Sequence, residues 1–177
     1  SLHAGVVEIF VGKNSKVRYS TIQNWSKDVN NLVTKRAIVL DGGHMEWIDG
    51  NIGSCITMKY PSCILKGDNS SGRSMSIAYA KDNQQLDAGA KMIHLGKNTT
   101  STIISKSISE SGGVANYRGL VKITKDAINS NAFVKCDTLI LDQFSKSDTY
   151  PTNILLNNQS ILEHEATISK ISEEKLY

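Results

Sequence analysis

The sequence has little of several features that identify common protein classes. Its 177 residues include two prolines, and only 6% of them are aromatic. No apolar run approaches the roughly 20 residues that a membrane-spanning helix requires, and no signal peptide precedes the first strand-like run. The net charge is +3, but the lysines are scattered among acidic residues. Because nucleic-acid binding needs basic residues gathered on one face, the sequence predicts neither nucleic acid nor membrane as a partner.

The three cysteines also lack a recognisable pattern. Cys55 and Cys63 lie fairly close in sequence, and Cys136 lies far from both. An odd number of cysteines does not make a disulfide framework. There is no C-x-x-C, so no closed zinc site or local four-cysteine cluster site is written in the chain. We therefore expect reduced thiols in a cytoplasmic protein, or in a plastid-like compartment if the source is eukaryotic, with Cys55 and Cys63 as structural residues.

Helix signals are scarce, because no stretch of about 12 residues carries an apolar stripe at helical spacing. Instead, apolar and polar residues alternate in short runs, which is the pattern of half-buried strands. Gly, Asn and Asp, which tolerate the backbone angles of tight turns, punctuate these runs. The alternation predicts an all-β chain with strands over residues 6–11, 17–22, 36–40, 44–48, 55–60, 62–66, 74–80, 90–95, 101–107, 117–123, 133–141 and 161–168.

A faint internal repeat favours a solenoid. The similar segments are Val-Gly-Lys-Asn (11–14), Leu-Gly-Lys-Asn (95–98) and Leu-Asn-Asn-Gln (156–159). Division of the two intervals between them into four and three coils predicts a repeat of roughly 20–21 residues, within the range of repeat proteins. The pattern thus suggests a β-helix, in which parallel strands stack and bury alternate side chains. A sandwich built from hairpins is the alternative.

Two motifs near the C-terminus carry a resemblance to a known family. One is Phe-Val-Lys-Cys-Asp-Thr at residues 133–138, and the other is Leu-Glu-His-Glu-Ala-Thr-Ile-Ser-Lys at 162–170. Similar segments follow the family's order along nearly the whole chain, at residues 19–25, 33–36, 59–62, 65–69, 91–94, 96–98, 101–106 and 117–122. The chain resembles the core of the SufB/SufD family, and SufB in particular, the scaffold of the SUF iron–sulfur cluster assembly system.

This resemblance implies a right-handed parallel β-helix core over residues 1–171. Residues 172–177 are then the start of a truncated C-terminal helical region, with Ser172 as its expected N-cap. The resemblance also implies a scaffold rather than a turnover enzyme, building a transient iron–sulfur cluster at a subunit interface and passing it to apoproteins. The implied partners are a SufC ATPase, which binds the helical region, a second SufB copy or SufD, and a cysteine desulfurase system.

The resemblance assigns cluster and sulfur binding to Cys136 and Glu165, with His164 as a weaker candidate. A thiolate and a carboxylate hold iron less firmly than four thiolates, which suits a cluster that is handed on. From its position alone, Cys136 is a buried small hydrophobic residue or a thiolate favoured by Lys135. Neighbours in a strand point to opposite faces, so His164 is expected on the apolar face with Leu162, where a hydrogen-bonded core histidine is the alternative. The segment from Cys136 to Glu165 is interpreted as one coil plus an inserted loop at residues 145–150.

Three further residues, Gln23, Trp25 and Lys35, match positions that in the family are thought to line an interior path for sulfur toward Cys136. Their alternatives are a satisfied turn for Gln23, core packing for Trp25 and a solvated charge for Lys35. The second cysteine of better-known SufB proteins is Ser145 here, a form closer to the lone SufB of systems without SufD.

Two other functions are compatible with a β-helix. A polysaccharide lyase or hydrolase would use acids and arginines along an open groove, for which Asp82, Asp87 and Arg118 are the candidates. Few aromatic residues and three unpaired cysteines disfavour this secreted class. A non-catalytic SufD-like subunit is the second alternative, and the presence of both Cys136 and Glu165 argues against it.

Overall fold

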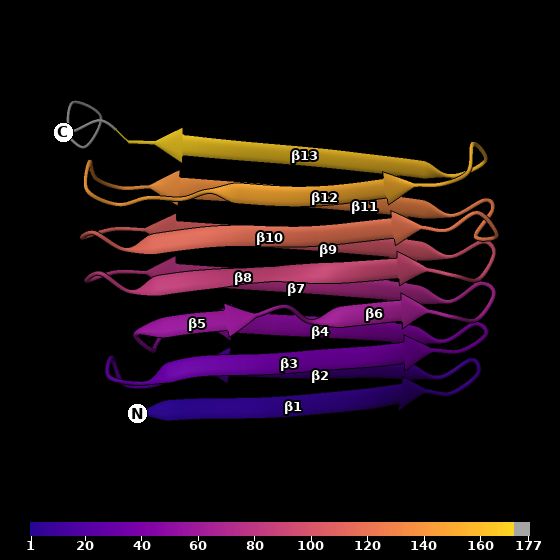
Figure 1. Cartoon of the computed structure of the whole chain (residues 1–177), viewed down its shortest axis with the longest axis horizontal. Helices are drawn as coiled ribbons and strands as arrows, with labels where there is room; N and C mark the ends of the chain where they lie inside the picture. The colour runs from indigo at the N-terminus through magenta and orange to yellow at the C-terminus, as the bar shows by residue number, and fades with distance from the viewer. Residues whose placement is uncertain (172–177) are drawn as a thin grey trace.

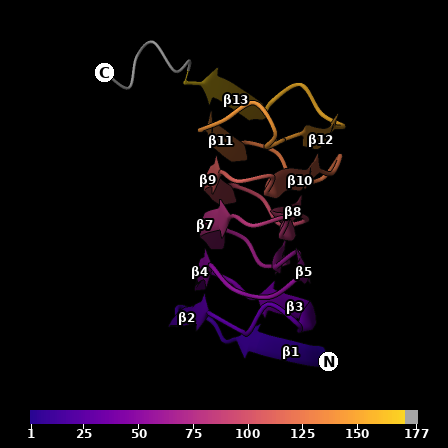
Figure 2. The same ribbon diagram turned by 90° about the vertical axis from the view of Figure 1, so that its left-hand side faces the viewer.

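The chain winds into a parallel β-helix of about six coils (Figure 1). The computed structural model describes residues 1–171, and this part of the chain contains no helix, so none that could cross a membrane. Each coil gives one strand to each of two parallel sheets, which face each other across the interior (Figure 2). The predicted all-β, parallel β-helical fold is confirmed. The expected start of a helical region at residues 172–177 lies outside the described residues.

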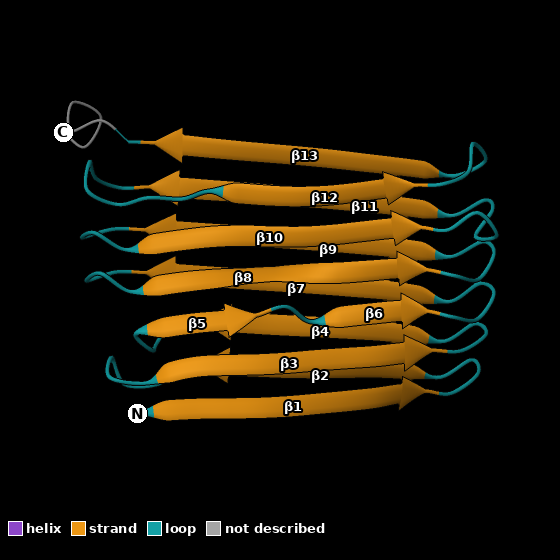
Figure 3. Ribbon diagram, viewed as in Figure 1, coloured by secondary structure: helices purple, strands orange, loops and turns teal. Residues whose placement is uncertain are grey.

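Strands of eight or ten residues form most of both sheets, joined by short loops, and β5, β6 and β12 are shorter (Figure 3). Sheet A has the order β1-β3-β5-β8-β10-β12, with β6 also pairing β3 and β8. Sheet B has the order β2-β4-β7-β9-β11-β13. Their bounds are β1 Leu2–Val11, β2 Lys16–Gln23, β3 Asn30–Val39, β4 His44–Asn51, β5 Ile56–Lys59, β6 Ser62–Leu65, β7 Ser71–Ala80, β8 Gln85–His94, β9 Thr100–Ser109, β10 Val114–Ile123, β11 Asn131–Ile140, β12 Thr149–Leu155 and β13 Ile161–Lys170.

The predicted strands all coincide with observed ones, and β12 is the one strand that was not predicted. Residues 145–150 were expected to form a polar loop, whereas β12 begins at Thr149 and pairs with β10 in parallel register. Pro151 lies within β12 and cannot donate a backbone hydrogen bond. A proline is tolerated there because β12 is the last strand of sheet A, and an edge strand has one side without a partner.

The predicted coil length is too short. Partners in neighbouring coils are as near in sequence as Asn30 and Ile56, and as far apart as Tyr117 and Thr149. The repeated segments at 11–14, 95–98 and 156–159 do occupy the same corner, after β1, β8 and β12. The two intervals between them, however, span three and two coils, not four and three. The repeat is real, but the number of coils assigned to it is too large.

This corner depends on residues that accept a left-handed backbone. Asn14, Asn69, Asn98 and Asn129 have φ between 54° and 58°, and Gly42 has φ 63° at the equivalent place. Asparagine and glycine adopt this conformation at low cost. Backbone hydrogen bonds link one corner to the next, as from the Asn14 amide to the Asp41 carbonyl at 2.8 Å. One such residue therefore turns the chain from sheet A to sheet B in each of the first five coils.

Sheet A is interrupted in its third coil, where β5 ends at Lys59 and β6 begins at Ser62. Pro61 lies in the gap and cannot donate a hydrogen bond toward β3. Its carbonyl still accepts one from the Lys91 amide of β8 at 2.9 Å. The proline thus explains why one strand of the coil is split while the stack of coils continues.

The interior is divided lengthwise into an apolar part and a polar part. The apolar part lies near the asparagine corner and includes Val39, Met45, Trp47, Leu65 and Ile123, all completely buried. Toward the opposite corner the buried side chains are largely polar. They include Gln23, Asn31, Lys35, Asp49, Asn51, Thr57, Lys59 and Ser76. The two ends of the same strands therefore contribute a conventional core and a polar interior.

His94 at the end of β8 makes the stability of the fold sensitive to pH. Its side chain is fully buried between the hydroxyls of Thr99 and Ser101, both at 2.8 Å. Burial lowers the pKa of His94 from 6.5 to about 4. Between these two pH values the unfolded chain binds a proton that the folded chain does not. The stability that the buried, neutral His94 contributes is therefore complete above pH 6.5 and is lost as the pH falls toward 4. The free energy of unfolding falls by about 3 kcal/mol over this range.

Urea unfolding followed at several pH values between 7 and 4 tests this expectation. The control is His94→Gln, which keeps a polar side chain but removes the titrating group. It should flatten the dependence of stability on pH in this window, whatever its effect at pH 7. An equally steep dependence in the variant would assign the effect to other groups.

Candidate functional site

A cavity of about 540 Å³ opens in the polar part of the interior, at the first coils. Its walls include Gln23, Trp25 and Lys35, the three residues that the sequence analysis assigns to an interior path. They come from the end of β2, from the loop after it, and from β3. The structure thus brings these three residues together around one space. It adds His3 and Lys59, which the sequence analysis does not single out.

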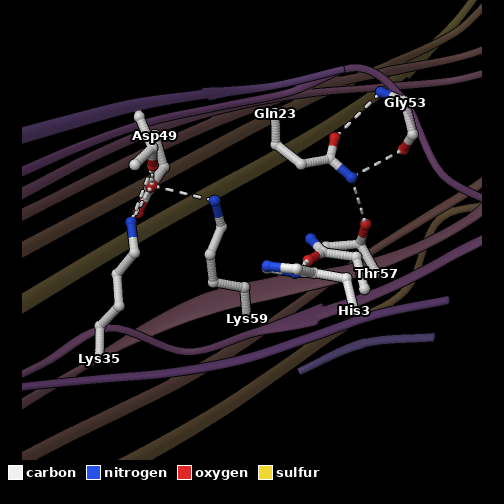
Figure 4. A network of polar contacts seen from close by, with 9 residues as sticks. His3, Gln23, Lys35, Asp49, Gly53, Thr57 and Lys59 are labelled. Carbon is white, nitrogen blue, oxygen red and sulfur yellow. Dashed lines mark hydrogen bonds and ion pairs between the residues drawn. The ribbon is translucent and has the colours of Figure 1, made fainter. Parts of the chain in front are cut away.

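A buried ion cluster forms one side of this cavity (Figure 4). The Lys35 and Lys59 ammonium groups donate to the same carboxylate oxygen, Asp49 Oδ1, at 2.6 and 3.0 Å. Lys35 also donates to the Thr21 hydroxyl at 2.8 Å, and that hydroxyl donates to Asp49 Oδ1. Lys35, Lys59 and Asp49 are each only 3% exposed at their side chains. The alternative of a solvated Lys35 is therefore wrong.

Burial and charge act in opposite directions on this cluster. Burial alone would raise the pKa of Asp49, but the positive charges and hydrogen bonds of the two lysines outweigh it and hold that pKa below its usual value. The pKa of Lys59 is lowered by burial and by the charge of Lys35, against the attraction of Asp49. The charge of Lys35 also faces the rings of Tyr19 and Trp47, at 5.0 and 5.7 Å from their centroids.

Gln23 and Trp25 are held in place by the loop that follows β4. The Gln23 amide accepts a hydrogen bond from the Gly53 amide at 3.0 Å and donates to the Gly53 carbonyl and the Thr57 hydroxyl, both at 3.2 Å (Figure 4). A Cβ atom at Gly53 would collide with the backbone of Trp25, so only glycine allows this close approach. Trp25 itself is 44% exposed and stacks on the His3 ring at 4.8 Å. It is therefore a wall of the cavity and not part of the core.

Cys136 lies in the fifth coil, on the inner face of β11, and is 3% exposed. The Tyr117 hydroxyl lies against its thiol and has no hydrogen bond of ordinary geometry to any other described residue. Gly119 makes room for this phenol, since a Cβ atom there would collide with the ring. Burial raises the pKa of Cys136 to about 11, although the Tyr117 hydroxyl opposes this shift. The thiol is consequently protonated at neutral pH in this conformation.

Cys136 and Glu165 lie on neighbouring strands but on opposite faces of sheet B. The residue paired with Cys136 is Ala166, while Glu165 pairs with Lys135. Lys135 and Glu165 both point outward and form an ion pair at 3.4 Å. The expected effect of Lys135 on the thiol is therefore wrong, because alternate residues of a strand face opposite sides. The interpretation of an inserted loop is also wrong, because the segment between the two residues is a single coil of ordinary length that contains β12.

His164 is the candidate site residue of the second motif that shares the inner face with Cys136. It pairs with Val134 on β11, and its side chain is partly buried together with that of Leu162, as the strand pattern predicts. Its Nδ1 atom is 3.1 Å from the side-chain amide nitrogen of Asn153 on β12. Its Nε2 atom is buried and has no hydrogen-bond partner among residues 1–171. Burial also lowers the pKa of His164, which favours the neutral ring.

A row of polar residues on the inner face of sheet B connects the two regions. In successive strands, Asp49 pairs with Ser76, Ser76 with Ser105, and Ser105 with Cys136. The Ser76 and Ser105 side chains are both buried, at 6% and 8% exposure. Small residues of sheet A occupy the middle coils on the other side, including Ala88 and Ala90. Small side chains, polar on sheet B and apolar on sheet A, thus line the interior between the ion cluster and the thiol.

The three candidate residues of a polysaccharide-active site do not all come together. Asp82, in the corner after β7, forms an ion pair with Lys27. Asp87 points outward from β8 and binds Arg118 at 2.7 Å. Of the remaining cysteines, Cys63 is fully buried in the apolar core, where burial raises its pKa to about 12, and Cys55 is exposed. The structural role expected for Cys63 agrees with this position.

Comparison with known proteins agrees with the family resemblance that the two C-terminal motifs carry. Residues 1–177 match the family described as "SUF system FeS cluster assembly, SufBD core domain". An iron–sulfur cluster assembly SufBD family protein of Staphylococcus aureus is 56% identical over the whole chain, and one of Staphylococcus saprophyticus is 55% identical. In both cases the chain spans 38% of the length of the relative.

Proposed function

Because the chain belongs to the SufBD family of iron–sulfur cluster assembly proteins, we propose that it is the core of a SufB-type scaffold. In this proposal Cys136 and Glu165 bind the iron of a transient cluster, and sulfur at the sulfide level joins that iron after losing its proton, with no change of oxidation state. The observation that carries it is the polar row from Asp49 through Ser76 and Ser105 to Cys136. Such a row has no evident use in a solenoid whose interior needs only to be filled. It suits the passage of a small polar species along the coils.

Sulfur enters this row at the first coils. Gln23, Trp25 and Lys35 line the cavity there, and a cysteine desulfurase system is the proposed source of the sulfur. A sulfur species that carries negative charge is stabilised by the lysines of the ion cluster, and the serine hydroxyls beyond it can donate hydrogen bonds. Most large apolar side chains of the core lie nearer the other corner, and small residues such as Ser76 and Ala88 lie on this side, with Tyr117 beside Cys136.

Cluster assembly takes place at an interface formed by the last coils. β13 is the end strand of sheet B, and its outer backbone edge has no partner strand within residues 1–171. An exposed strand edge readily pairs with another chain. Cys136 lies one strand inward from this edge, and His164 and Glu165 lie on the edge strand itself. We propose a second SufB copy, or SufD, as the chain that pairs there.

Both proposed ligands reach one cluster only after β13 rearranges. The Cys136 thiol faces the interior and is protonated, while Glu165 faces outward and is 60% exposed. A SufC ATPase acting on the longer protein is the proposed source of the movement. Exposure of the thiol to water would remove the burial that raises its pKa, and so increase the fraction of the thiolate that binds iron.

Replacing Glu165 by alanine is expected to reduce cluster assembly without loss of stability. The ion pair with Lys135 is exposed, so its removal costs less than about 1 kcal/mol. The carboxylate, in contrast, is a proposed iron ligand. Anaerobic reconstitution of the longer protein with iron and sulfide, read by visible absorption, should give less cluster for Glu165→Ala than for the unaltered protein.

Lys135→Ala is the matched control for this experiment. It breaks the same ion pair but keeps the carboxylate, so it should reconstitute normally. Equal yields for Glu165→Ala and the unaltered protein would remove Glu165 from the ligand set. Equal losses in both variants would mean that the ion pair matters and not the carboxylate.

A further inference from the structure

We propose that the cavity beside Lys59 binds a small anion of single charge. Lys59 belongs neither to the site residues assigned from the sequence nor to the ligands of the proposed cluster. Anion binding itself depends only on the geometry of the first coils. Its physiological ligand, an anion of the hydrosulfide class, rests on the proposed function.

The first argument is the charge of the ion cluster. Two ammonium groups, Lys35 and Lys59, share one carboxylate, Asp49, and all three are almost completely removed from water. The buried group therefore carries one uncompensated positive charge. Such a charge is costly in a protein interior unless a counter-charge is near. The side chains that line the cavity include no carboxylate.

The second argument is the number of hydrogen-bond donors. An ammonium group has three N–H donors. Lys35 uses two, on Asp49 and Thr21, whereas the only partner of the Lys59 ammonium among the described residues is Asp49. Figure 4 shows Lys59 extending toward Asp49 beside the amide of Gln23, which is occupied by Gly53 and Thr57. Two donors of Lys59 are therefore left for a ligand in the cavity.

The third argument is the character of the walls. Val7, Val33, Tyr19 and Trp25 contribute apolar surface around the charged end of the cavity. The polar side chains among the walls, such as Asn24 and Asn31, carry no charge, and Lys35 and Lys59 are the lysines that line the cavity. The cavity therefore favours a soft, weakly hydrated monoanion over a strongly hydrated anion such as sulfate. Hydrosulfide has this character, and iodide is a convenient probe with the same properties.

Iodide quenching of tryptophan fluorescence tests the proposal on the purified protein. Trp25 lines the cavity, while the other tryptophan, Trp47, is completely buried. At constant ionic strength, iodide should quench the tryptophan fluorescence more strongly than neutral acrylamide does, and this excess quenching should saturate. The excess of iodide over acrylamide quenching should be roughly tenfold, at the lower end of the enrichment that charged clefts produce. Sodium sulfide, added anaerobically, should displace the iodide, and sodium sulfate should not.

Three variants separate the role of Lys59 from a general charge effect. Lys59→Met should abolish the excess iodide quenching and leave acrylamide quenching unchanged, whereas Lys59→Arg should retain it. Lys66→Met removes the same charge from an exposed corner and should have no effect. Should Lys59→Met fail to fold, the saturation and competition measurements on the unaltered protein still decide the question. Non-saturable quenching, or an unchanged excess in folded Lys59→Met, would overturn the proposal.

The measurement contains no iron and no assembly partner. If the protein does not bind iodide but cluster assembly still depends on Cys136, this inference is refuted and the proposed function stands. Saturable iodide binding that sulfide does not displace would overturn hydrosulfide as the ligand.

Discussion

Replacing Cys136 by serine is expected to abolish cluster assembly in cells while the β-helix stays folded. The change removes the soft iron ligand but almost no volume. A buried hydroxyl in place of the thiol should lower the free energy of unfolding by about 1–3 kcal/mol. The measurement is complementation of a bacterial strain that lacks its own SufB by the longer protein carrying Cys136→Ser. No growth is expected under conditions that require the SUF system.

Cys63→Ser is the matched control, because Cys63 is equally buried but lies in the apolar core of the third coil. It should lose a similar amount of stability and still support growth. The two variants together separate a loss of folding from a loss of chemistry. Full rescue by Cys136→Ser would show that this cysteine is only a core residue, and would refute the proposed role in assembly.

Replacing Asp49 by asparagine is expected to destabilise the β-helix strongly. The substitution leaves Lys35 and Lys59 buried without a counter-charge, and breaking a buried ion pair in this way typically costs about 3–5 kcal/mol. Thermal unfolding followed by circular dichroism measures the effect. Asp82→Asn is the control, since it breaks an exposed ion pair with Lys27 and should cost less than about 1 kcal/mol.

The contribution of Asp49 should also depend on pH in a defined direction. The pKa of Asp49 in the folded protein lies below its usual value of 3.8. Its stabilising effect is therefore complete above pH 3.8 and is lost as the pH falls through the lower, folded-state pKa. The difference in stability between Asp49→Asn and the unaltered protein should narrow under these acidic conditions. A difference that does not change with pH would mean that the carboxylate charge is not the cause.

Much of the fold is predictable from the sequence because its strands are half-buried. Alternation marks every strand except β12 correctly, since inward side chains pack and outward ones meet water. β12 escapes because its side chains are mostly exposed in the last coil of sheet A, so its sequence has no apolar alternation. The coil length also had a signal, because a left-handed asparagine or glycine recurs at nearly even spacing, once in each of the first five coils. These corner residues are Asn14, Gly42, Asn69, Asn98 and Asn129.

The site is less predictable because it depends on which residues of distant strands become neighbours. Lys35, Asp49 and Lys59 come from β3, β4 and β5, and nothing in their spacing reveals that they meet. A signal was nonetheless present, since Lys59 follows Thr57 at alternate, inward positions of a predicted strand. The register between β11 and β13 cannot be derived from the sequence either, which explains why Glu165 was grouped with Cys136. A shift of one residue between Cys136 and its neighbouring strand decides whether a carboxylate or Ala166 faces the same side as the thiol.

The stacking of the coils also sets a length. Three steps of sheet B, from β4 through β7 and β9 to β11, separate Asp49 from Cys136. Neighbouring strands are about 4.8 Å apart, so the backbone positions of these two residues are held about 14 Å apart. Longer or shorter corner loops change how many residues a coil contains, but they leave this spacing untouched. Insertion or removal of a whole coil is the change that would alter it, in increments of one strand.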